Sequence, residues 1–245
     1  MSVVPGEGRQ SPEAISIGSD TESDTSERLA KDAIVLPWWI GANTTERLRT
    51  FLDYEGVGPR KSLISLPRLP SWGFHDKTAY LCEDGRPIQL WVVGILDSMS
   101  FFASTAHSNP GTAIAISLLR DLDRDALAAV KSMGKPPTPP FDNMFRASKA
   151  GYGINNSIQL FTEVYDATEA YGSKLSMKQI PASSLVAGDV VLAEVKVVRY
   201  ELGPHKNQGR WTSWRIDFEL QSISRLVARP VVKIEREDDG FEEVM

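Results

Sequence analysis

The 245-residue sequence has one cysteine, Cys82, and three histidines. A single thiol cannot form an intramolecular disulfide, and so few cysteines and histidines exclude a cysteine-rich zinc site. No apolar run approaches the ~18–20 residues of a membrane-spanning helix, and the acidic, polar N-terminus is unlike a signal peptide. We therefore expect an intracellular protein, nuclear or cytoplasmic with the nucleus favoured, that binds no metal, no cofactor and no membrane.

Motifs of catalysis are also missing from the sequence. The three histidines, His75, His107 and His205, lie in unrelated contexts, and no Gly-x-Ser-x-Gly motif is present. Residues 56–62 superficially resemble a phosphate-binding loop but lack the glycine that must precede the lysine. We expect no catalytic residues and no enzymatic activity.

Charge is spread unevenly along the chain. The net charge of −5 divides into −4 for residues 1–32, +3 for residues 33–230 and −4 for residues 231–245. Residues 1–30 also contain few large apolar side chains, a composition typical of disorder. The predicted organisation is a disordered acidic N-terminal tail over 1–32, a single globular domain over 33–230 and an acidic C-terminal tail over 231–245.

Hydrophobic patterning predicts an α+β or mostly β fold. Two apolar runs around an Asp-Gly turn make residues 78–96 a hairpin candidate, and residues 63–66 read as a strand. The apolar stripe over 112–130 is typical of a helix, and residues 141–172 also favour helix. We therefore expect 111–172 to be a helix-rich insertion between strands.

The clearest pattern is a hairpin over 189–227, close to the C-terminus. Along 214–221 apolar residues alternate strictly with polar ones, so one face of this strand should be buried. The parity then shifts, because Ile223 and Val227 are out of phase, and this predicts a bulge at Ser222. The two strands are joined by a basic, polar loop, 202–210.

Aromatic and basic residues gather around this loop, and this is the composition that binding of unpaired bases requires. Aromatic rings stack on bases while cations contact phosphates. The predicted phosphate contacts are Arg199, Lys206, Arg210 and Arg215, and the predicted stacking residues are Tyr200, Trp211 and Trp214. The alternative is that the tryptophans simply pack the mouth of the hairpin. Asp217 and Glu219, on the outer face, would repel phosphates.

The long strand after Gly188-Asp189, the basic loop and the strand over 214–223 resemble the last hairpin of OB-fold single-stranded DNA-binding proteins of the phage and bacterial type. Such proteins often end in an acidic tail with an aromatic residue near the terminus, which competes with DNA and recruits partners. Phe241, within the acidic tail, is similar. The resemblance implies an OB-like β-barrel and non-catalytic binding of single-stranded nucleic acid, DNA before RNA.

Two protein contacts are the alternatives to nucleic acid. The same aromatics and arginines are also typical of protein-interaction hot spots, so a protein–protein interaction module is the second hypothesis. In the N-terminal tail, Ile15–Asp24 resembles a SUMO-interacting motif, because a short β-prone pair precedes acidic and phosphorylatable residues.

Overall fold

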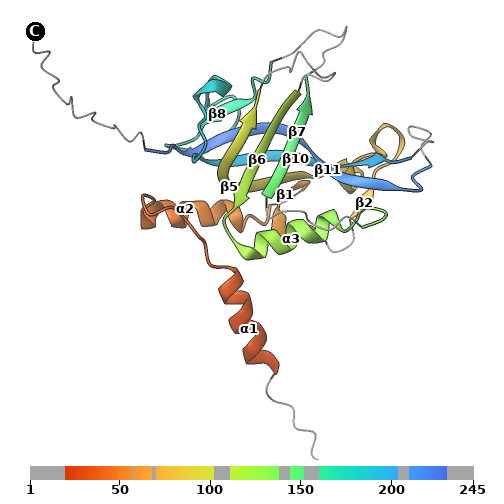
Figure 1. The fold of residues 1–245 in the computed structure, drawn as a ribbon, viewed down its shortest axis with the longest axis horizontal. Helices are drawn as coiled ribbons and strands as arrows, with labels where there is room; N and C mark the ends of the chain where they lie inside the picture. Colours follow the sequence, from red (N-terminus) through yellow and green to blue (C-terminus); the bar gives the residue numbers. More distant parts are fainter. Residues whose placement is uncertain are drawn as a thin grey trace, which may run out of the picture.

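The computed structural model describes residues 20–56, 58–67, 70–101, 111–137, 144–151, 160–203 and 210–230. Three α-helices occur in these ranges: α1 (Asp20–Lys31), α2 (Ala42–Leu52) and α3 (Asp121–Lys131). None of them is long and apolar enough to cross a membrane. The strands are arranged in one large sheet and one small one (Figure 1).

Five strands of the large sheet close into a barrel. They are β5 (Gln89–Ser100), β6 (Gly111–Leu118), β7 (Met144–Ala150), β10 (Val190–Glu201) and β11 (Trp214–Val227). β5 pairs with both β6 and β10, β6 with β7, and β10 with β11, all antiparallel. β7 pairs with β11 in parallel and completes the ring. A five-stranded closed barrel with this mixture of pairings is OB-like, and the predicted fold class is confirmed.

The other strands are short additions to the barrel. β1 (Arg60–Ser62) extends the sheet beside β5, and β8 (Val164–Asp166) with β9 (Lys178–Gln179) extends it beside β11. β2 (Ser71–Trp72), β3 (Leu81–Glu83) and β4 (Arg86–Pro87) form a separate three-stranded sheet.

The hairpin predicted at 78–96 is present, but it is split between the two sheets. Asp84 and Gly85, at its turn, both have positive φ, 50° and 70°, as a two-residue hairpin turn requires. The strands on either side of this turn, β3 and β4, belong to the small sheet, and only β5 enters the barrel. Cys82, on β3, is buried, as expected for a small core residue.

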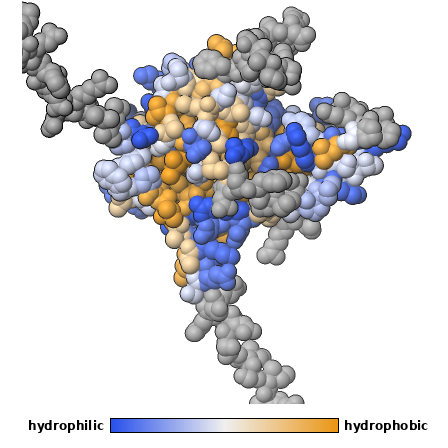
Figure 2. Space-filling model, viewed as in Figure 1, coloured by the Kyte–Doolittle hydropathy of each residue, from blue (hydrophilic) through white to orange (hydrophobic). Residues whose placement is uncertain are grey.

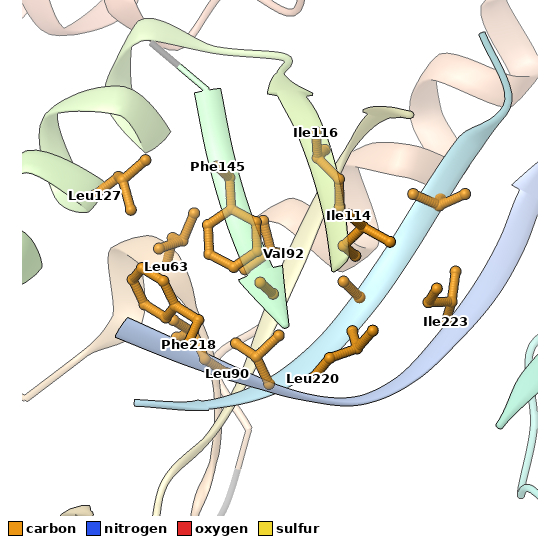
Figure 3. Packing of buried hydrophobic residues seen from close by; sticks show 14 of the residues in the cluster. Leu63, Leu90, Val92, Ile114, Ile116, Leu127, Phe145, Phe218, Leu220 and Ile223 are labelled. Carbon is orange, nitrogen blue, oxygen red and sulfur yellow. The ribbon is translucent and has the colours of Figure 1, made fainter. Parts of the chain in front are cut away.

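The barrel interior is filled by alternate residues of its strands. Leu90 and Val92 of β5, Ile116 of β6, and Phe145 of β7 point into one cluster with Phe218 of β11 (Figure 3). The alternation predicted for β11 is confirmed, and the shift in parity is confirmed as well. The ladder skips Gln221 rather than Ser222, because Glu194 pairs with Ser222 and Val195 pairs with Leu220.

Two predicted helical segments are strands instead. Residues 111–118 form β6, and residues 144–150 form β7, so 111–172 supplies two of the five barrel strands rather than a helical insertion. The error has a physical source: Ile114 and Leu118 are four residues apart and continue to Leu122, which imitates a helical stripe, although Ile114, Ile116 and Leu118 also alternate with period two. Only α3 remains of the predicted helix, and residues 63–65 form a 3-10 turn, not a strand.

The N-terminal region also differs from the expectation. The expected disordered tail over 1–32 contains α1, which projects away from the barrel (Figure 1). Only the acidic end of the SUMO-like segment Ile15–Asp24 lies in this helix, and its β-prone pair falls outside the described residues. Residues 1–19 and the acidic tail 231–245 lie outside the described residues.

One buried arginine joins all three helices. Arg120, directly before α3, contacts Asp123 at 2.9 Å, Asp32 at 2.7 Å and Asp53 at 2.5 Å. Asp32 follows α1 and Asp53 follows α2, so one guanidinium holds the ends of two helices against the start of the third. Its Nη2 also donates to the carbonyl of Leu52.

Candidate functional site

The predicted binding residues are placed in two environments, and the first is a buried cage. Arg199 of β10 has only 8% of its surface exposed, and three indole rings surround its guanidinium. The distances from its central carbon to the ring centroids are 4.5 Å for Trp72, 3.9 Å for Trp211 and 5.3 Å for Trp214. Its Nε donates to the carbonyl of Thr78 at 3.0 Å.

This burial corrects the predicted role of Arg199. Desolvation lowers the pKa of Arg199 to about 10, and the charge of Glu201 opposes the shift. A guanidinium enclosed by indoles and hydrogen-bonded to the backbone is not presented to a phosphate. Sequence adjacency suggested an exposed cation, but the side chain points to the small sheet that carries Trp72, which is far away in the sequence.

The tryptophans of the cage make packing contacts, the alternative considered for them above. Trp214 Nε1 donates to the carbonyl of Met133 at 2.9 Å, and its ring packs against the main core. Trp211 has a left-handed backbone, φ 48°, and its backbone N–H donates to the Glu201 carboxylate at 3.1 Å. Arg199 and Glu201 thus hold a strained residue at the root of the β10–β11 connection. Whether these half-buried rings also stack on bases remains a prediction.

The second environment is exposed. Tyr200 is 45% exposed, and the guanidinium of Arg215 lies 5.7 Å from its ring centroid on the neighbouring strand. Burial, with the charges of Asp217 and Glu219, raises the pKa of Tyr200, against the effect of Arg215. Arg210, in the connection between β10 and β11, is exposed. Lys206 lies outside the described residues.

The two carboxylates expected to repel phosphates both interact with other side chains of the protein. Asp217 contacts Arg215 at 2.8 Å and Lys131 at 3.7 Å. Glu219 accepts a hydrogen bond from the Tyr80 hydroxyl at 2.9 Å. Part of the negative charge on the outer face of β11 is therefore compensated within the protein.

A groove runs across the outer face of β5, β6 and β7. It encloses about 510 Å³, and its wall on the far side is the start of β11. Its floor consists of two rows of laterally paired residues: Ser98 beside Ala115 and Arg146, and Ser100 beside Ala113 and Ser148. The side chains of these two rows are small except that of Arg146, and the larger Met99, Ile114 and Phe218 also line the groove.

Two arginines line this groove, and neither α2 nor α3 packs over it. Arg146 of β7 and Arg215 of β11 both line the groove and are both exposed. α2 packs on the outside of β5 near Trp91, and Leu127 and Val130 of α3 pack into the core at the barrel end. Figure 2 shows hydrophobic side chains over the centre of the face formed by β5, β6 and β7, with hydrophilic ones around it.

The floor residues and Arg146 were missed by the sequence reasoning. Along β6, the small residues Ala113 and Ala115 alternate with the large Ile114 and Ile116, which is typical of a strand whose outer face carries only small side chains. The same pattern was interpreted as a helical stripe, so the exposed Ala113 and the buried Ala115 were not recognised as one face of a strand. No cluster of three metal-ligating side chains occurs in the described part of the chain.

No family model matches this chain, and no curated protein matches its sequence. Among solved structures, the chain is similar to gp2.5, a single-stranded DNA-binding protein encoded by bacteriophage T7, with TM-score 0.41 and 12% identity over 65% of this chain and 96% of that one. It is also similar to the single-stranded DNA-binding protein from bacteriophage Enc34 in complex with ssDNA, with TM-score 0.35 and 10% identity over 64% of this chain and 96% of that one. The OB-like arrangement is read from this chain's own strand pairings.

Proposed function

We propose that this protein binds single-stranded nucleic acid without catalysing a reaction, and that the groove across β5, β6 and β7 is its binding surface. The observation that carries the proposal is the groove on the outer face of the OB-like barrel, lined by small serine and alanine side chains together with two exposed arginines. This face of an OB fold is where oligonucleotides bind in that fold class.

The floor suits an unpaired strand for steric reasons. Small side chains let flat bases approach the sheet, and the hydroxyls of Ser98, Ser100 and Ser148 can donate to phosphate or base oxygens. Arg146 and Arg215 supply positive charge for a phosphodiester backbone, and Asp217, which also lines the groove, is paired with Arg215 and Lys131.

The modest charge of the body favours a single strand over a duplex. Residues 33–230 carry +3, whereas proteins that bind double-stranded DNA present a strongly basic surface. Aromatic stacking contributes about 1–3 kcal/mol per base and does not depend on charge. The exposed ring of Tyr200 is not part of the groove lining but lies 5.7 Å from the guanidinium of Arg215, which is, so a strand leaving the groove past Arg215 can stack on it.

The test is the salt dependence of binding, measured by fluorescence anisotropy with labelled single-stranded DNA, single-stranded RNA and duplex DNA. Arg215→Ala should flatten the slope of log affinity against log salt by about 0.7 if this side chain neutralises one phosphate. Arg28→Ala, an equally simple loss of an exposed arginine on the projecting helix α1, is the matched control and should leave the slope unchanged. Equal slopes for wild type and both variants would remove Arg215 from the interface.

The same measurement distinguishes the second hypothesis, a protein-interaction module, from nucleic-acid binding. A protein-interaction module that used the exposed aromatics would bind its partner through apolar contacts, and its affinity would change little with salt. Absence of binding to all three nucleic acids would favour that hypothesis.

A further inference from the structure

A second, apolar pocket lies at the end of the barrel, and it extends the proposed binding path. We propose that this pocket, lined by Phe101, Leu160, Phe161 and Ile180 among others, binds one unpaired base of the strand that occupies the groove. The inference rests on the proposed function, because the base must belong to a bound single strand.

The pocket has the size and the walls that a base requires. It encloses about 480 Å³. The rings of Phe101 and Phe161 lie 15° from parallel with their centroids 6.4 Å apart, so they offer flat surfaces of one orientation. Leu160, at the rim, is 70% exposed and packs little against the protein. A planar, largely apolar ligand is the chemistry that these walls fit.

A cation, Lys149, lies beside the pocket, over the Phe161 ring. Lys149 Nζ is 5.6 Å from the Phe161 ring centroid. The ammonium group of a lysine can bind a phosphate. Because Lys149 lies over the Phe161 ring, a phosphate bound to it would be adjacent to the stacking surface. An apolar peptide would have no use for this charge, which favours a nucleotide as the occupant.

The pocket and the groove adjoin at the end of β7. A cavity of about 170 Å³ shares Leu160, Phe161 and Thr162 with the pocket and is lined on its other side by Lys149. Lys149 directly follows Ser148 of the groove floor on β7. Successive residues of a strand point to opposite faces, so Lys149 lies on the other face of β7 from Ser148, and a bound strand would reach the two phenylalanines by passing around the end of β7.

The rim carries polar groups that a base edge can meet. The Gln179 amide nitrogen donates to the Thr162 carbonyl at 2.6 Å, which orients the Gln179 side chain at the pocket. Its carbonyl oxygen and the hydroxyls of Thr162 and Ser183 supply an acceptor and two donor–acceptor groups. Every base has such an edge, so the pocket selects for an unpaired base rather than for one sequence.

The test uses oligothymidylates of increasing length, from about 3 to about 16 residues, the range of site sizes of OB folds. Oligonucleotides too short to reach the pocket should bind wild type and Phe101→Ala equally. Longer ones should gain affinity on wild type, and Phe101→Ala should lose that gain, about 5- to 150-fold. Leu160→Ala, at an exposed position that does not affect folding, should lose a smaller part of it at the same lengths.

Leu175→Ala is the matched control, because Leu175 is fully exposed and lies away from the pocket. It should behave as wild type at every length. Oligonucleotides with 5-iodouracil should crosslink to Phe101 or Phe161 only when they are long enough to reach the pocket.

The outcomes that overturn the inference are distinct from failure of the proposed function. If wild type binds but Phe101→Ala and Leu160→Ala bind all lengths as wild type does, the pocket holds no base and a protein segment is its occupant. If these variants weaken all lengths equally, the residues act through the fold and the base site is wrong. If wild type binds no length, the proposed function itself fails.

Discussion

Replacing Arg120 with methionine should destabilise the protein more than any substitution of an exposed charge. The Arg120 side chain is 0% exposed and that of Asp123 is 3% exposed, so this pair is fully desolvated. Asp32 and Asp53 are 30% and 43% exposed, and solvent screens their share to no more than about 1 kcal/mol each. Removing the cation leaves the Asp123 carboxylate buried without its partner, which typically costs about 3–5 kcal/mol.

Urea denaturation monitored by tryptophan fluorescence measures this loss. With an m-value of about 3 kcal/mol/M, the midpoint should fall by about 1–2 M. Arg124→Met is the matched control, because Arg124 pairs with the exposed Asp121 on the same helix, and it should cost about 1 kcal/mol or less. Arg120→Met combined with Asp123→Leu should recover much of the loss, since both charges are then replaced by apolar groups. A midpoint for Arg120→Met as high as that of Arg124→Met would refute this account of the network.

Two further predictions concern the barrel. Gly94→Ala should destabilise by about 1–3 kcal/mol in the same urea assay, because its Cβ would meet Ile116 and the neighbouring backbone. Gly41→Ala has open space and should cost only the change at the N-cap of α2, about 0.5 kcal/mol, and equal effects would contradict the close packing of β5 on β6. Burial, with Glu219 as hydrogen-bond acceptor, raises the pKa of Tyr80 to about 12, so its contribution to stability should be complete below pH 10 and lost as the pH rises from 10 to 12. Tyr80→Phe should reduce this alkaline loss, and an unchanged pH profile for that variant would show that Tyr80 is not its source.

The strict alternation over 214–221 predicted the strand β11, and the resemblance of this hairpin to OB-fold single-stranded DNA-binding proteins implied the OB-like class. The sequence did not predict β6, because four-residue and two-residue spacings coincide at Ile114 and Leu118. Such ambiguity is resolved only by the pairing of β6 with β5 and β7, which is non-local.

The candidate site was predicted only in part for a related reason. Exposed Tyr200 and Arg215 lie near the groove, as a local pattern of aromatics and cations suggested. The burial of Arg199 depends on Trp72, more than a hundred residues earlier, and no local pattern carries that information. Small floor residues such as Ala113 have no chemical signature in a sequence and become meaningful only when three strands bring them side by side.

The most direct test of the binding surface places a negative charge in the middle of the groove. Ala113 is exposed between Ser100 and Ser148, so Ala113→Glu puts a carboxylate where phosphates or bases should lie, and Asn43→Glu places the same charge at the exposed start of α2. In anisotropy titrations with a labelled single-stranded oligonucleotide, Ala113→Glu should bind at least about tenfold more weakly than wild type, while Asn43→Glu should match wild type. Equal binding by all three proteins, with the same salt dependence, would contradict the proposal that the groove is the nucleic-acid site.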